Sequence, residues 1–143
     1  MENRLKYDHR NTVRAALLLA GACLALTRPA AAVDLNGAWA SDAENCAKVF
    51  VRKGTQVSFA DMSDVYGGGF IIDNDQISGK YARCRIKAKK EDGKTIHLLA
   101  ACASDIMLQN VQFSLREVDA NSVIRLIPGM DGMEIKYARC PAP

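Results

Sequence analysis

The chain has 143 residues, of which 49% are hydrophobic and 24% charged, and its formal net charge is +3. That charge belongs to the first 32 residues, which hold five of the 19 Lys and Arg but only two of the 16 Asp and Glu, so that residues 33–143 carry 14 of each sign. A neutral segment lacks the basic excess of nucleic-acid and other polyanion binders, and its length suits a single domain with one core.

Residues 1–32 have the pattern of a cleavable secretory signal peptide. A basic start precedes an apolar run at residues 15–26, and three alanines at 30–32 provide the small residues of a cleavage site. The basic start consists of Arg4, Lys6, Arg10 and Arg14. The apolar run is shorter than the about 20 residues that span a bilayer. We therefore predict a periplasmic or secreted protein without a transmembrane segment after cleavage; lipidation at Cys23 is the alternative.

Of the five cysteines, four lie beyond the predicted signal peptide: Cys46, Cys84, Cys102 and Cys140. An even number of cysteines in an exported domain predicts two disulfides, for which three pairings exist. The spacings contain no C-x-x-C, and His97 is the only histidine outside the signal peptide. We therefore expect neither a metal site nor a cofactor.

One short helix is expected near the start of the domain, after a first strand at residues 33–40. Ser41 and Glu44 form the S-x-x-E pattern of a capping box. Apolar side chains then recur with helical spacing from Ala43 to Phe50, and Arg52-Lys53-Gly54 ends the helix.

The remaining residues alternate between apolar and polar positions, as strands do, and turn sequences separate them. The expected strands lie at 56–59, 70–72, 76–78, 81–90, 95–104, 111–116, 122–127 and 133–139. Such a series of antiparallel strands predicts a mainly β fold, namely a seven- to eight-stranded barrel or sandwich.

The central hairpin permits a prediction of register. If its turn centres on Gly93, Cys84 lies opposite Cys102, Ile86 opposite Ala100 and Ala88 opposite Leu98, all on one face. The same register places Arg85 opposite Ala101, Lys87 opposite Leu99 and Lys89 opposite His97 on the other face. We therefore predict the disulfides Cys84–Cys102 and, by elimination, Cys46–Cys140.

Gly37-Ala38-Trp39 resembles the G-x-W signature of lipocalin-like (calycin) barrels, which include small periplasmic metalloprotease inhibitors. The resemblance implies that Trp39 closes one barrel end and that a late arginine, Arg139 or Arg125, packs over its ring. Only residues 33–36 precede the motif, whereas those inhibitors fill the protease cleft with an N-terminal segment. The domain also resembles small exported, cysteine-paired proteins of α-proteobacteria, which implies a compartment and no activity.

Two loops and one strand carry candidate binding residues. A candidate pocket lip consists of Asp61, Asp64, Tyr66, Gly67, Gly68 and Gly69, although a strand-entry loop explains these glycines equally well. Asp73-Asn74-Asp75 is typical of a hairpin turn more than of a calcium site, because Ile77 occupies the next ligand position. A candidate basic stripe for an anionic partner consists of Arg83, Arg85, Lys87 and Lys89.

No residue is assigned a catalytic role. His97 faces Lys89 in the predicted register, which does not suit a general base. We therefore expect an exported, non-enzymatic interaction module, with an inhibitor role as one form of it, whose partner is an unidentified periplasmic protein or an anionic surface. The alternatives are a carrier of small ligands or lipids, and a hydrolase that uses Asp61 with Asp64 or His97.

Overall fold

The computed structural model describes residues 34–141. The predicted signal peptide at residues 1–32 and the lipidation alternative at Cys23 lie outside this range and stay predictions.

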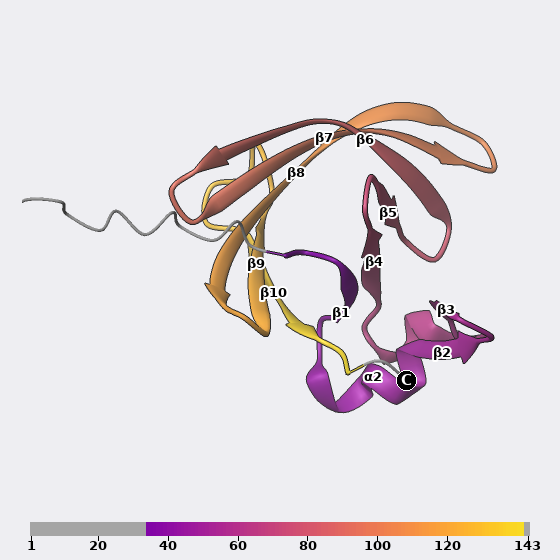
Figure 1. The fold of residues 1–143 in the computed structure, drawn as a ribbon. Coiled ribbons are helices and arrows are strands. Elements are labelled where there is room, and N and C mark those ends of the chain that lie inside the picture. The colour runs from indigo at the N-terminus through magenta and orange to yellow at the C-terminus, as the bar shows by residue number, and fades with distance from the viewer. Residues whose placement is uncertain (1–33, 142–143) are drawn as a thin grey trace, which may run out of the picture. The chain divides into compact units, whose positions relative to one another are not determined.

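Eight antiparallel strands form a closed barrel, as Figure 1 shows. Strands β4 to β10 follow one another around the barrel in chain order, and β1 closes it by pairing with both β4 and β10. The strands are β1 (Gly37–Ala40), β4 (Gly69–Asp73), β5 (Gln76–Ser78), β6 (Ala82–Asp92), β7 (Thr95–Ser104), β8 (Leu108–Asp119), β9 (Ser122–Leu126) and β10 (Glu134–Arg139). The predicted mainly β fold is therefore confirmed, in its barrel form.

Alternate side chains of the strands fill the barrel interior. Trp39 is fully buried, and the Phe70 ring contacts both Trp39 and Tyr137, with ring centroids 6.3 and 4.8 Å apart respectively. The other fully or nearly buried interior side chains include Ile72, Ile77, Ile96, Leu98, Leu115 and Val123. The interior around Trp39 is thus a packed core.

Residues 41–68, between β1 and β4, form a separate insertion. It comprises the 3-10 helix η1 (Ala43–Asn45), α2 (Cys46–Val49), the hairpin of β2 (Phe50–Lys53) and β3 (Gln56–Phe59), and the 3-10 helix η2 (Ser63–Tyr66). A second apolar cluster joins Val49 and Phe50 of the insertion to Ala38, Ala40 and Cys140, which lie on β1 and after β10. These barrel residues alternate with inward-facing ones, so the insertion covers the outer face of the barrel wall.

The predicted helix is shorter than expected, and its capping box is wrong. Asp42 caps η1 by accepting from the Glu44 N–H, whereas the Ser41 hydroxyl donates to the Gly67 carbonyl. Phe50 leaves the helix because its ring packs against that of Phe59, which lies opposite it in the β2–β3 hairpin. The residues expected to end the helix therefore belong to β2 and its turn.

Both predicted disulfides are present. Cys84–Cys102 joins neighbouring strands β6 and β7 on the inner face, and Cys46–Cys140 ties α2 to the chain after β10. Because the second bridge closes a loop of 94 residues and the first one of 18, chain entropy makes them worth about 4–5 and about 3 kcal/mol respectively. The insertion is therefore held by a covalent link as well as by packing.

The predicted hairpin register holds only as far as Ile86. Cys84 faces Cys102, Arg85 faces Ala101 and Ile86 faces Ala100 as expected. A β-bulge at Lys87 then shifts the pairing, so Ala88 lies opposite Leu99, Lys89 opposite Leu98 and Lys90 opposite His97. The predicted pairs beyond the bulge are wrong, because one extra residue in a strand exchanges its faces.

Gly69 provides a test of how closely β1 and β4 approach each other. A Cβ at this position would lie 2.2 Å from the Trp39 carbonyl oxygen and 2.9 Å from the Phe50 ring. We expect Gly69→Ala to lower the free energy of unfolding by about 1–3 kcal/mol, the usual cost of overpacking, in urea denaturation. Gly79→Ala is the matched control, since its nearest neighbour lies 3.9 Å away; equal effects of the two substitutions would contradict the argument.

Candidate interaction surface

One end of the barrel is closed by Trp39 and Arg139. The guanidinium lies 4.3 Å from the centroid of the Trp39 ring and donates to the backbone carbonyls of Asp34, Asn36 and Ala120. The indole N–H donates to the Leu35 carbonyl at 2.9 Å. Of the two arginines considered from the sequence, Arg139 therefore makes the contact, which gives this end a structural role.

The residues of the candidate pocket lip extend from Asp61, before η2, through η2 to Gly69 at the start of β4. Gly67 and Gly68 adopt positive φ angles of 96° and 78°, and a Cβ on Gly67 would lie 2.6 Å from the Ser41 hydroxyl. Their carbonyls accept hydrogen bonds from Ser41. The glycines thus shape the return of the chain into β4, as the loop interpretation of the sequence required.

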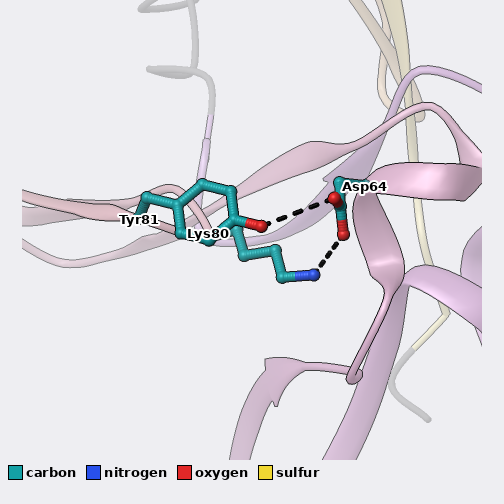
Figure 2. A network of polar contacts seen from close by, with 3 residues as sticks. All are labelled: Asp64, Lys80 and Tyr81. Carbon is teal, nitrogen blue, oxygen red and sulfur yellow. Dashed lines mark hydrogen bonds and ion pairs between the residues drawn. The ribbon is translucent and has the colours of Figure 1, made fainter.

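Asp64 connects η2 to the turn between β5 and β6. One carboxylate oxygen pairs with the Lys80 ammonium, and the other accepts from the Tyr81 hydroxyl at 3.4 Å, as Figure 2 shows. The hydrogen bond from Lys80 is the main cause that lowers the pKa of Asp64 from its ordinary value of 3.8, and the same contact raises the pKa of Lys80 from 10.5. Both oxygens of Asp64 therefore contact the turn and not a second carboxylate such as Asp61.

Large apolar side chains are exposed around this connection. The β5–β6 turn lies beside the β7–β8 turn because Ala82 pairs with Ser104. Ile106 and Leu108, in and after the β7–β8 turn, are 91% and 84% exposed. We call the whole set the apolar loop cluster: Met62, Val65, Tyr66, Tyr81, Ile106, Met107 and Leu108. Large apolar side chains exposed on neighbouring segments are a feature of interaction sites.

The basic residues of β6 do not form the single stripe that was expected. Arg83 and Arg85 precede the bulge and face outward, since they alternate with the buried Cys84. Lys89 follows the bulge, lies opposite the buried Leu98 and forms an ion pair of 2.8 Å with Glu91. The bulge at Lys87 thus divides the four cations between two faces.

His97 contacts a buried hydroxyl, and residues 73–75 form the turn of a hairpin. The His97 Nδ1 lies 2.9 Å from the Ser114 hydroxyl, but Ser114 is only 4% exposed, which shields this oxygen from a substrate. Asn74 turns the β4–β5 hairpin with φ 52°, and its N–H donates to the Asn36 side chain. Among residues 34–141, no three His, Cys, Asp or Glu side chains are grouped to hold a metal ion.

The apolar residues of the β7–β8 turn were not singled out from the sequence. Their signal was available, because Ile106-Met107-Leu108 is an apolar run directly after Ser104-Asp105, a position where a turn is normally polar. Within the described range, no helix combines the length and hydrophobicity needed to cross a membrane. No family model, curated protein or solved structure matches the chain.

The Asp64–Lys80 contact predicts a defined pH dependence. The depressed pKa of Asp64 means that this contact stabilises the fold above pH 3.8 and loses that effect as the pH falls through the lowered value. The raised pKa of Lys80 likewise preserves the contact below pH 10.5 and removes it as the pH rises through the higher value. A carboxyl NMR titration should therefore find Asp64 below 3.8 in the wild type.

The control for this titration is Lys80→Met, which removes the main cause of the shift and should raise the pKa of Asp64 toward its ordinary value of 3.8. An unchanged titration of Asp64 in the variant would contradict the assigned contact.

Proposed function

We propose that the domain is an exported, non-catalytic binding module that engages a partner protein through the apolar loop cluster. The observation that carries this proposal is the exposure of seven large apolar side chains on three adjacent loop segments. A folded monomer gains nothing from leaving such side chains in water, whereas a partner surface would remove them from it. Four of the seven side chains are tyrosine or methionine, which are enriched in protein interfaces.

The ordering of these loops supports the same proposal. Asp64 holds η2 against the β5–β6 turn, while Lys48 and Lys80 lie over the rings of Tyr66 and Tyr81, at 5.0 and 5.5 Å from their centroids. Side chains that are positioned before binding lose less conformational entropy on association. Two disulfides suit work in an oxidising compartment such as the periplasm. An anionic surface has less support as a partner, because the β6 cations are divided.

The test is affinity capture with the oxidised protein on a solid support and periplasmic extract as the source of partners. We expect the double variant Tyr81→Ser, Ile106→Ser to lose a specific protein that the wild type retains. The matched control is Met130→Ser, Met133→Ser, which removes two exposed apolar side chains outside the cluster. Equal retention by both double variants, or no specific protein on the wild type, would contradict the proposal.

A second candidate function, the carriage of a small acidic ligand, is favoured by Arg125. This residue pairs with Leu115 and Ile135, whose side chains belong to the interior core, so its side chain faces inward. Its Nε is buried and has no hydrogen-bond partner within the described residues, and the guanidinium lies 4.8 Å from the Phe113 ring. A carboxylate ligand would supply the missing acceptor.

Oleic acid is the probe for this second function. A carrier should show a higher melting temperature with oleic acid, since a ligand that binds only the folded state stabilises it. Arg125→Met should abolish the increase, whereas Arg116→Met, which removes an outward-facing arginine paired with Glu134, should preserve it. The absence of any oleic acid effect on the wild type would contradict this function.

A further inference from the structure

Along half of the length of strand β8, one of its two edges is not paired with another strand. On one side β8 pairs with β7 from Leu108 to Arg116. On the other side β9 pairs with it only from Ser114 to Asp119, because β9 ends at Leu126. Within residues 34–141, the outer edge of 108–113 is therefore unpaired, and we call it the free β8 edge.

The direction of the backbone groups along this edge follows from the ladder. The Ile86 N–H donates to the Asp75 carbonyl, on the β5 side of β6. Residues two apart in a strand direct their backbone N–H and C=O groups to the same side, so those of Cys84 also point away from β7. Cys84 and Cys102 are then a narrow pair without mutual hydrogen bonds, in agreement with their Cα separation of 3.9 Å. The backbone groups of Cys102 therefore point toward β8, where they form hydrogen bonds with its ladder partner Gln109.

Alternation along β8 then assigns the free groups. Gln109, Val111 and Phe113 bond to β7, while the N–H and C=O groups of Leu108, Asn110 and Gln112 point away from the barrel ladder. These are the groups that a further strand would bond.

The composition of this edge is that of a paired strand. Residues 106–115 contain no charge, no proline and no glycine. By contrast, the free edge of β6 beyond Ile86 has the bulge at Lys87 and charges at five of the six positions 87–92. Charges and bulges are the usual means by which strand edges avoid association. A bulge and charges therefore oppose strand pairing at the free edge of β6, whereas the free β8 edge has neither.

We propose that the free β8 edge pairs with the same edge of a second copy of this chain. A two-fold antiparallel pairing that uses all the free groups places Asn110 opposite its own copy and Leu108 opposite Gln112. The two Asn110 side chains then lie together on the outer face, where one amide can donate to the other. No charge repulsion opposes this pairing, because the segment is uncharged and residues 33–143 are formally neutral.

We favour a second copy over an unrelated peptide as the occupant, because a second copy brings an edge whose backbone groups are also unpaired. Its inward-facing Val111 and Gln109 would cover the half-buried Val111 at the barrel opening. Ile106 and Met107 lie next to the pairing segment and would add buried apolar area. The proposal rests on the backbone of β8 and is tested at Asn110, which lies outside the apolar loop cluster, because Ile106, Met107 and Leu108 are shared with the proposed partner surface.

The test is sedimentation equilibrium of the oxidised wild type and of three single variants. We expect a reversible wild-type dimer. Asn110→Pro should be monomeric, because it removes a free N–H without breaking the β7 ladder. Glu91→Pro is the matched control on the β6 edge, where alternation beyond the bulge also points the N–H outward, and should still dimerise. Asn110→Lys should be monomeric through repulsion between lysines directly opposite each other.

Opposite charges at position 110 of the two copies test the proposed register. Asn110→Asp should also be monomeric on its own, whereas an equimolar mixture of Asn110→Lys and Asn110→Asp should form a heterodimer. Amide hydrogen exchange at Leu108, Asn110 and Gln112 should slow as the wild-type concentration rises. A monomeric wild type, failure of the mixture to dimerise, or protection that does not depend on concentration would overturn the proposal.

Discussion

The closure of the barrel depends on Trp39 and the arginine that covers it. Trp39 is fully buried, and its ring lies between Phe70 of the core and the guanidinium of Arg139. A cation–π contact of this kind contributes about 0.5–2 kcal/mol, but the hydrogen bonds of the guanidinium extend its effect. They hold the segment before β1 and the β8–β9 turn to the end of β10. One residue pair thus joins the first and last strands at the point where the barrel closes.

This closure determines where the rest of the chain can act. The Arg139 end is occupied by backbone and side chain, and the insertion between β1 and β4 covers the outer wall near Ala38 and Ala40. The Cys46–Cys140 bridge keeps the insertion there. Most of the exposed large apolar side chains of the described residues then lie in the apolar loop cluster, which adjoins the free β8 edge. The barrel therefore serves as a rigid support that presents loops and an edge, with a packed core around Trp39.

The cysteine pairing and most strands could be predicted from the sequence because both follow from alternation with period two. Cys84, Ile86, Ala100 and Cys102 share a face in any register that buries the apolar residues, and the bridge follows. The bulge at Lys87 could not be predicted in this way, since a run of alternating cations gives no sign of an extra residue. Its effect on the surface is large, because it divides the cations expected to form one stripe between two faces.

Other features of the candidate surface depend on contacts distant in sequence. Asp64 was a candidate, but its partner Lys80 lies 16 residues away in the sequence, and only the fold brings the two together. Phe50 continued a helical pattern until its contact with Phe59 made a strand more stable. Local propensity is a weak guide where tertiary packing opposes it. Predictions from the sequence therefore succeeded for most of the barrel wall, and failed beyond the bulge at Lys87 and for the helix of the insertion.

The two free edges of the barrel show how composition distinguishes a solvent-facing strand from a pairing one. Both edges arise for the same reason, namely that β5 and β9 are shorter than the strands they border. On β6, the unpaired length is bulged and charged; on β8, it is regular and uncharged. Because both edges are exposed to solvent, exposure alone does not explain why only the β6 edge is bulged and charged. A requirement to keep the β8 backbone accessible to another strand accounts for it, because each charge that would prevent association would also prevent that pairing.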